Sequence, residues 1–297
     1  MRILLLGKNG QVGWELQRSL MVLGELIALD RNYEGALCGD LANAEALRKT
    51  IRLLKPDVIV NAAAYTAVDK AETEPERAYQ VNSIACQLLA EEAASLGTLL
   101  VHYSTDYVFN GEGDKPWTES ADTGPLNQYG VTKLAGEQAI TASKCNHLIF
   151  RTSWVYGARG NNFAKTMLRL AGERESLSVV ADQVGAPTGA ELIADVTAQA
   201  IKAAVARPEY SGIYHLAASG ETSWHGYAEY AFSIARELGL PLRVETVQPI
   251  CSEEFPTPAA RPKNSRLNTN KLQDAFSIYL PDWKVGVRRM LMEVLNK

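Results

Sequence analysis

The chain has 297 residues, of which 46% are hydrophobic, and a formal net charge of −4. This length suffices for one large domain or two modest ones with a sizeable core. The mild acidity gives no reason to expect nucleic-acid or anionic-membrane binding. No apolar run approaches the ~20 residues that span a bilayer, and the run at residues 4–6 is too short for a signal peptide. The four scattered cysteines predict reduced thiols in a cytoplasmic protein.

A short apolar run, Arg2–Leu6, opens the chain, and a glycine-rich turn and a helical pattern follow it. The glycines have the spacing Gly-x-x-Gly-x-x-Gly. We expect Gly7 to allow a tight turn, Gly10 to let the backbone approach a pyrophosphate, and Gly13 to let the helix pack on the strand. Free N–H groups at the helix start favour phosphate. This order predicts a dinucleotide site, with an ordinary strand-to-helix turn as the alternative.

The second predicted strand, residues 25–30, ends in a carboxylate. Asp30 lies where an acidic residue meets the adenosine ribose, which favours NAD, or it is a turn residue. Arg31 can receive the extra phosphate of NADP, so we predict use of both cofactors. Further along, Asp40 and Leu41 either lie beside the adenine or mark a helix N-terminus capped by Asp40.

Strands and helices then alternate through the first half of the chain. Strands are predicted at 57–60, 99–103 and 148–150, and helices at 76–96 and 127–142. This alternation predicts a Rossmann-like, doubly wound parallel sheet. Turn residues become denser after about residue 153, so we assign 1–152 to a dinucleotide-binding domain and 153–297 mainly to a smaller substrate-binding lobe, with helices at 191–205 and 224–238. The chain can re-enter the first domain, and a cleft between the two would hold a ligand.

The pair Tyr129 and Lys133 carries the strongest chemical signal. Residues four apart on a helix share a face. A nearby cation lowers the pKa of a phenol, so Tyr129 could exchange a proton with a sugar or alcohol oxygen. Taken alone, the spacing also fits a solvent-exposed helical pair. Ser104 and Thr105 lie at the carboxyl end of the 99–103 strand, where ligands of doubly wound sheets bind, although either could instead cap a turn.

Four motifs occur in the order found in extended short-chain dehydrogenases/reductases: the glycine turn, Asn-Ala-Ala-Ala at 61–64, Ser-Thr-Asp at 104–106, and Tyr129-x-x-x-Lys133. The longer segments at 61–72, 102–109, 150–156 and 261–267 resemble the dTDP-4-dehydrorhamnose reductase family over essentially the whole chain. The resemblance implies reduction of the C4 ketone of dTDP-4-dehydro-L-rhamnose, with NADPH or NADH, to dTDP-L-rhamnose, a precursor of bacterial surface polysaccharide such as the lipopolysaccharide O-antigen. It implies Tyr129 as proton donor, Thr105 as hydrogen-bond donor, and Lys133 as the residue that holds the nicotinamide ribose and lowers the pKa of Tyr129.

The resemblance also implies wider binding sets. The cofactor set is Gly7, Asn9, Gly10, Gln11, Val12, Gly13, Asp30, Arg31, Asp40, Leu41, Ala62, Ala63, Ala64, Tyr65, His102, Tyr103, Tyr129 and Lys133. The substrate set is Thr66, Val68, Ser104, Thr105, Asp106, Trp154, Asn162, Arg261 and Arg266. Asp106 also fits a turn or cap residue, and Trp154 either stacks on the deoxysugar or belongs to the core. Asn162 and Arg266, with Arg261 as a competitor, are candidates for the nucleotide diphosphate, and a surface salt bridge is the alternative for each arginine.

Some family members pair as dimers through a magnesium ion, and Glu15, Glu191 and Glu293 stand in comparable positions, or are simply solvated. Two other functions stay open. One is a nucleotide-sugar epimerase or dehydratase of the same fold, although no adjacent pair of acids follows Thr105. The other is a non-enzymatic subunit resembling the regulatory subunit of methionine adenosyltransferase.

Overall fold

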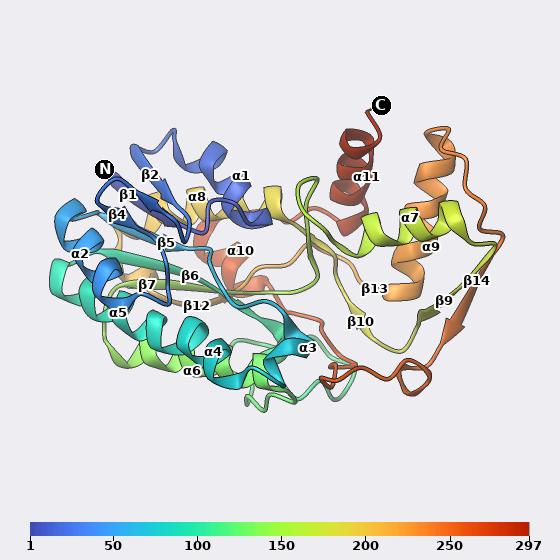
Figure 1. Cartoon of the computed structure of the whole chain (residues 1–297), viewed down its shortest axis with the longest axis horizontal. Coiled ribbons are helices and arrows are strands. Elements are labelled where there is room, and N and C mark those ends of the chain that lie inside the picture. The colour runs from blue at the N-terminus through green and yellow to red at the C-terminus, as the bar shows by residue number, and fades with distance from the viewer. Residues whose placement is uncertain (297) are drawn as a thin grey trace.

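The computed structural model describes residues 1–296, and a six-stranded parallel sheet in the order β12-β7-β6-β5-β1-β2 forms its centre (Figure 1). The order reverses between β1 and β5, which is where doubly wound sheets bind ligands. The predicted fold class is therefore confirmed. The strands are β1 (Arg2–Leu6), β2 (Glu25–Leu29), β5 (Val58–Asn61), β6 (Leu99–Thr105), β7 (His147–Thr152) and β12 (Gly212–His215).

Helices cover both faces of this sheet because its strands carry buried apolar side chains on both faces. Successive side chains alternate between faces, so Ile3 and Leu5 join one core while Leu4 and Leu6 join the other. The first core is closed by α1 (Gln11–Leu20), α8 (Ala190–Ala206) and α10 (Asn270–Phe276). The second is closed by α2 (Ala44–Leu54), α5 (Ala85–Leu96) and α6 (Gln128–Ala142).

A third core lies at the other end of the molecule, where Figure 1 shows α7, α9 and α11 together with β9 and β14. The parallel pair β9–β14 and the antiparallel pair β10–β13 belong to this lobe, and the parallel pair β8–β11 leads into it. The bounds are β8 (Val155–Tyr156), α7 (Phe163–Glu173), β9 (Ser176–Val180), β10 (Val184–Gly185), β11 (Thr188–Gly189), β13 (Thr222–Ser223), α9 (Trp224–Glu237), β14 (Thr246–Ile250) and α11 (Trp283–Val294).

The remaining elements are short. They are the antiparallel pair β3 (Tyr33–Glu34) and β4 (Leu37–Cys38), the helices α3 (Val68–Ala71) and α4 (Pro75–Tyr79), the 3-10 turns at Asp106–Val108, Pro208–Tyr210 and Ser252–Glu254, and a π-helical turn at Gln80–Ile84. Over the part of the chain that the structure describes, no helix combines the length and hydropathy needed to cross a membrane. Cys38, Cys86, Cys145 and Cys251 are free thiols, as predicted.

The predicted strands and most predicted helices are confirmed, with one correction. The helix predicted at 76–96 runs without a break through α4, the π-helical turn and α5, but its winding widens to the π-helical form at Gln80–Ile84. Asn82 lies in this turn and reaches out of it: its side chain bonds the backbone N–H and C=O of Tyr65 and the hydroxyl of Thr132. Such turns insert a residue into a helix and often mark functional sites.

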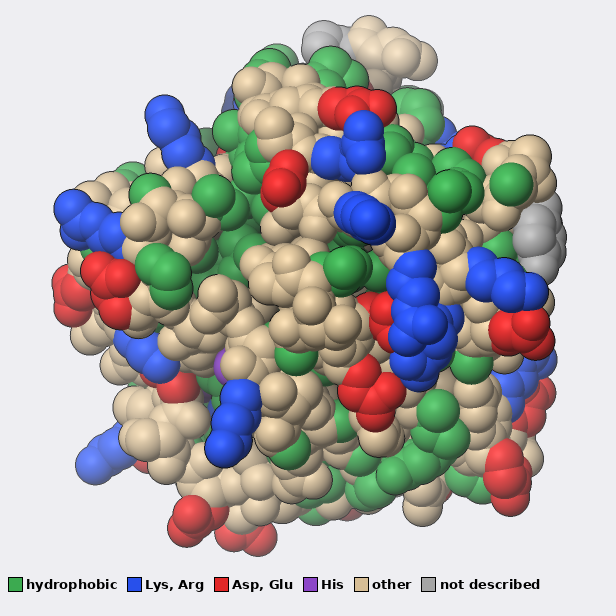
Figure 2. All heavy atoms as spheres, turned by 90° about the vertical axis from the view of Figure 1, so that its left-hand side faces the viewer, with side chains coloured by type: hydrophobic (Ala, Val, Ile, Leu, Met, Phe, Trp, Pro, Cys, Tyr) green, Lys and Arg blue, Asp and Glu red, His purple; other side chains and the backbone are tan. Residues whose placement is uncertain are grey.

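The sheet receives its last strand from the second half of the chain, since β12 pairs with β7. The division at residue 152 into cofactor and substrate lobes stays a prediction. On the face shown in Figure 2, basic and acidic side chains are interspersed and hydrophobic side chains are scattered among them.

Candidate active site

The glycine turn after β1 has the close packing that its sequence predicts. Gly7 has a φ of +88°, and a Cβ there would lie 2.7 Å from the backbone nitrogen of Ala63. A Cβ at Gly13 would lie 2.0 Å from the carbonyl oxygen of Gly7, whereas one at Gly10 would meet that oxygen at 3.5 Å, an ordinary contact. Gly10 is the N-cap residue of α1, so no side chain caps the start of this helix. The turn therefore offers backbone N–H groups to an anion, which fits a pyrophosphate.

Asp30 follows β2 at the same edge of the sheet. Its carboxylate accepts hydrogen bonds from the Asn9 amide at 2.5 Å and from the Asn32 backbone at 2.7 Å. Arg31 is exposed. Glu34, three residues further along the chain, forms an ion pair with Lys8 of the glycine turn. Polar groups of both signs therefore surround the position where the sequence predicts the adenosine ribose.

The cap that the sequence offered as an alternative for Asp40 is wrong. Asn43 caps α2 by accepting a hydrogen bond from the backbone of Ala46, while Asp40 accepts one from the backbone of Ala42 in the preceding turn. Leu41 is buried in the core beneath α2. A place for Asp40 beside the adenine stays a prediction.

Thr105 and Tyr129 meet at the carboxyl end of β6. Asn127 caps α6 by accepting a hydrogen bond from the backbone of Gly130 at 2.8 Å, which puts Tyr129 in the first turn of that helix. The Thr105 hydroxyl lies close enough to the Tyr129 phenol to influence its pKa, and it also donates to Asp106 and accepts from the Tyr107 backbone at 3.2 Å. The ring of Tyr107 contacts that of Tyr129 edge-on, with centroids 5.7 Å apart. Two hydroxyl groups predicted to share one substrate oxygen thus lie together.

The expectation that Lys133 lowers the pKa of Tyr129 is wrong for this structure. Burial and the negative charge of Asp106 raise the pKa of Tyr129 to about 12, and the Thr105 hydroxyl acts in the opposite direction. The Lys133 amine is turned toward β6, where it donates to the Tyr103 carbonyl oxygen at 2.6 Å and lies 3.1 Å from His102 Nε2. Burial has the opposite effect on Lys133, whose pKa it lowers because the buried charged amine loses its hydration.

Asp106 is more than the turn residue that the sequence suggested. Its side chain is 2% exposed and accepts a hydrogen bond from the Thr105 hydroxyl at 3.1 Å. Burial raises the pKa of Asp106 to about 7; the hydrogen bond from Thr105 acts in the opposite direction, and among the described residues Asp106 Oδ2 has no hydrogen-bond partner. Ser104 is buried beside it, and among the described residues its hydroxyl has no hydrogen-bond partner.

The segment after β5 lies next to the glycine turn. Ala62, Ala63 and Ala64 are partly exposed there, and the hydroxyl of Tyr65 donates to Glu74 at 2.9 Å. Thr66 is exposed just beyond. By contrast, His102 is 1% exposed, so it lies behind this surface rather than on it.

Comparison with known proteins decides the family. Residues 1–296 match the family model described as the RmlD substrate binding domain. A dTDP-4-dehydrorhamnose reductase from Escherichia coli strain K12 is 57% identical over 296 residues, covering 100% of this chain and 99% of the relative. The chain belongs to the dTDP-4-dehydrorhamnose reductase family. It is accordingly an enzyme of the oxidoreductase class.

Solved structures of the family agree over the whole chain. One from Clostridium acetobutylicum is 37% identical, has a TM-score of 0.88 and covers 100% of both chains. Another, from Bacillus anthracis in complex with NADP, is 37% identical with a TM-score of 0.87 and covers 98% of this chain and 99% of its own. The sequence left three functions open. These matches support the reductase, rather than an epimerase or dehydratase of the same fold or a non-enzymatic subunit.

Trp154 has a partner that the sequence did not reveal. It adopts a positive φ of +50° and stacks on Trp224 with ring centroids 3.6 Å apart. Trp224 begins α9, and Phe163 packs against its ring at 4.6 Å. One face of Trp154 is therefore covered by the core of the second lobe, and the side chain stays partly exposed.

The three polar residues predicted to hold the diphosphate lie in different surroundings. Asn162 caps α7 and donates to Gln11 at 3.2 Å, so it ties the second lobe to the helix of the glycine turn. One guanidinium nitrogen of Arg261, Nη2, donates to both carboxylate oxygens of Asp69 at 2.9 Å, and Arg266 pairs with Glu221 at 2.7 Å. Both arginines thus engage carboxylates, as the salt-bridge alternative predicted. Val68, another predicted substrate contact, begins the helix that carries Asp69.

The glutamates predicted to bind magnesium come from α1, α8 and α11, and among the described residues they are not a group whose ligand atoms lie within 4.8 Å of one another. The charges of Glu15 and Glu293 add to burial in raising the pKa of Glu191, and Arg289 lies 3.3 Å from Glu191. A pocket of about 180 Å³ is lined by Glu191 and Glu293. Neither the glycine turn nor Tyr129 lines this pocket.

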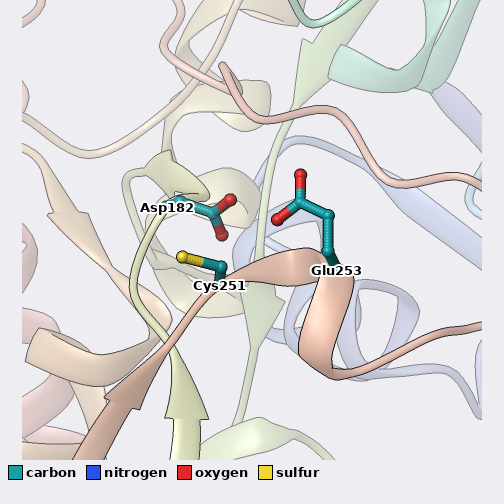
Figure 3. A group of neighbouring side chains, drawn as sticks. All are labelled: Asp182, Cys251 and Glu253. Atoms are coloured by element: carbon teal, nitrogen blue, oxygen red, sulfur yellow. The ribbon is translucent and has the colours of Figure 1, made fainter.

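A different set of side chains brings possible metal-ligand atoms closest together. Asp182, Cys251 and Glu253 hold such atoms within 4.8 Å of one another, and Figure 3 shows the three side chains gathered between β14 and the turn after it. The Lys263 amine lies 3.0 Å from Asp182 and 2.8 Å from Glu253. The positive charge of Lys263 therefore offsets the negative charges of Asp182 and Glu253.

Proposed function

We propose that this chain reduces the C4 ketone of dTDP-4-dehydro-L-rhamnose to dTDP-L-rhamnose with NADPH or NADH. The 57% identity to a dTDP-4-dehydrorhamnose reductase supports the substrate. The observation that carries the chemistry is the proximity of the Thr105 hydroxyl and the Tyr129 phenol at the carboxyl end of β6.

Tyr129 suits the role of proton donor because its pKa of about 12 keeps the phenol protonated at neutral pH. A bound reduced nicotinamide supplies the hydride that the ketone carbon receives. Negative charge then grows on the ketone oxygen, an alkoxide far more basic than a phenolate. Tyr129 donates its proton there, while Thr105 donates a hydrogen bond to the same oxygen. Water later returns a proton to Tyr129.

The cofactor would lie over the glycine turn, with its pyrophosphate at Gly10 and the N-terminus of α1. Asp30, already oriented by Asn9, would accept the ribose hydroxyls of NADH, and exposed Arg31 would accept the extra phosphate of NADPH. Lys133 would donate to the nicotinamide ribose. Because Asp30 and Arg31 are adjacent, we propose that the enzyme uses both NADH and NADPH.

The sugar nucleotide would reach Tyr129 from the second lobe. Trp154, stacked on Trp224, would offer its remaining face to the apolar side of the deoxysugar. For the diphosphate, Arg261 or Arg266 would exchange its carboxylate partner for phosphate oxygens, which bind the guanidinium fork in the same way.

We keep a magnesium-bridged homodimer and a cytoplasmic location as parts of the proposal. Glu15 and Glu293 interact electrostatically with Glu191, and magnesium prefers carboxylate oxygens as ligands.

The test is to supply the dTDP-4-keto-6-deoxyhexose intermediate with NADPH or NADH and follow the absorbance of the reduced nicotinamide. We expect one cofactor consumed per ketone with either nucleotide. Interconversion of the sugar with trace cofactor and no net consumption would indicate an epimerase instead.

A further inference from the structure

Trp154 has a backbone conformation that its surroundings must hold in place. Its φ of +50° lies in the left-handed region, which a residue with a bulky side chain adopts at an energetic cost. Residues of this kind persist where the surrounding structure fixes them, and they gather at ligand-binding positions. Trp154 follows the end of β7 by two residues, and that strand end, Thr152, pairs with Thr105 in the register of the sheet. The strained residue therefore lies just beyond the strand end next to Thr105.

Trp224 covers one face of the Trp154 indole. The two rings are almost parallel, at 11°, and their centroids are 3.6 Å apart. Phe163 of α7 also contacts Trp224, so the lower ring of the stack is anchored in the core of the second lobe. Trp154 cannot turn or relax its backbone without losing this contact.

A series of hydrogen bonds fixes the orientation of the lower ring. An indole N–H can only donate, and Trp224 Nε1 donates to Gln183 Oε1 at 3.1 Å. The amide nitrogen of Gln183 must then point the other way, where it donates to the Ser252 hydroxyl at 3.0 Å. That hydroxyl donates in turn to Asp182 at 2.7 Å. Because every donor in the series has an acceptor, Trp224 has one preferred orientation.

Strand β10 closes the edge of the upper ring. A Cβ on Gly185 would lie 3.0 Å from Trp154 Cε2 and 3.2 Å from its Nε1, so the indole edge lies against this glycine. β10 pairs with β13, which leads directly into Trp224, and it exchanges backbone hydrogen bonds with residues 263–265. One short strand therefore joins both stacked tryptophans to the segment that continues to Arg266.

We propose that Trp224 is a positioning residue, which holds Trp154 as a rigid platform for the sugar ring of the nucleotide substrate. This inference rests on the proposed function and adds to it the residue that supports the sugar site from behind. With one face covered and one edge blocked, the partly exposed Trp154 has its other face left for a ligand. An aromatic face suits the apolar C–H groups of a 6-deoxy sugar. A ring that is already fixed loses little freedom when the sugar binds.

Titration calorimetry with two ligands separates the sugar from the nucleotide. The affinity for dTDP-L-rhamnose divided by the affinity for dTDP measures what the sugar adds. In Trp224→Leu the Trp154 ring loses its support and can leave the strained conformation, so this ratio should fall about five- to tenfold. The affinity for dTDP alone should stay within about twofold of wild type. Trp224→Phe keeps a ring beneath Trp154 and should retain most of the ratio.

Two further variants separate positioning from general loss of stability. Gly185→Ala keeps Trp224 but places a methyl group against the indole edge, so it should lower the same ratio. Phe232→Leu is the matched control, because Phe232 is 1% exposed in the same core and, over residues 1–296, makes no ring contact with the stack. It should lower the Tm and leave the ratio unchanged.

NMR relaxation of the protein labelled with ¹⁵N-tryptophan tests the support without any ligand. The chain has five tryptophans, and Trp154→Phe identifies the Trp154 signal. The order parameter of its indole N–H should be about 0.85 in wild type and clearly lower in Trp224→Leu, but not in Phe232→Leu.

Three results would overturn the proposal. They are an equally rigid Trp154 in Trp224→Leu, an equal loss of affinity for dTDP and dTDP-L-rhamnose in that variant, and a ratio that Trp224→Leu leaves at its wild-type value. Equal binding of the two ligands by wild type would likewise remove the platform from the site. If wild type binds neither ligand, the proposed function fails, and the relaxation data still decide whether Trp224 holds Trp154.

Discussion

At the residue scale, burial governs the candidate site. Tyr129 stays protonated, Thr105 contacts both Tyr129 and Asp106, and Lys133 is turned away toward β6. The Tyr-x-x-x-Lys spacing identified the two residues but gave the wrong sign for the pKa of the phenol. Sequence spacing specifies a shared helix face, whereas the pKa depends on burial and on Asp106, neither of which the spacing contains.

Asp106 gives a pH-dependent stability. In the unfolded chain it titrates near 3.8, and in the folded protein its pKa is about 7. Its contribution is fully present below pH ~4 and is lost as pH rises through about 7, because the folded state must then bury a charge. Asp106→Asn removes this pH-dependent loss. We therefore predict that the unfolding free energy of the variant minus that of wild type increases by on the order of 4 kcal/mol from about pH 4 to pH 8.5.

Urea unfolding at both pH values measures this difference. Asp114→Asn, which removes one charge from an exposed position, is the matched control and should show little change. A difference for Asp106→Asn that is the same at both pH values would show that the carboxyl is not destabilised by burial.

At the scale of elements, the glycine turn is the part that local sequence describes best. Gly13 was predicted to let α1 pack on β1, and a methyl group there would lie 2.0 Å from Gly7 oxygen. We predict that Gly13→Ala costs about 1–3 kcal/mol or more in stability and weakens NADPH binding at least tenfold, because the turn must move.

Gly172→Ala is the matched control for that substitution. Gly172 lies in α7 with no atom within 4 Å of the added carbon, so alanine should stabilise the helix by up to about 1 kcal/mol and leave NADPH affinity unchanged. Thermal unfolding and titration calorimetry measure both quantities. Equal NADPH affinity in Gly13→Ala and wild type would remove the turn from the cofactor site.

Other local features were beyond sequence reasoning. The π-helical turn at Gln80–Ile84 continues the apolar pattern of the helix, so periodicity predicts one helix through it. The buried pair of Glu137 and Arg151 joins α6 to β7 and has no local signal. The stack of Trp154 on Trp224 joins residues seventy positions apart, which a single sequence cannot pair.

At the scale of the whole molecule, the alternation of strands and helices predicted the sheet but not its last strand. Residues 212–215 are short and lie within the second half, so local pattern gives no reason to place them beside β7. The contact of Asn162 with Gln11 likewise joins the two lobes through side chains far apart in sequence. Such contacts decide how the predicted substrate residues face Tyr129.

The proposed assembly is tested by molar mass. We predict that light scattering gives a dimer with magnesium, and that a chelator or Glu191→Gln shifts the protein toward the monomer. Glu229→Gln, on the outer face of α9, is the control. A molar mass independent of magnesium would leave the three glutamates as ordinary surface charges.

The proton-donor role of Tyr129 is tested most directly by single-turnover reduction of the 4-keto sugar nucleotide by NADPH in Tyr129→Phe. Loss of one donor at the developing oxyanion should slow the chemical step by about 10²–10³-fold, while NADPH affinity stays within a few-fold of wild type. Reduction by Tyr129→Phe at the wild-type rate would contradict the assignment of Tyr129 as the acid.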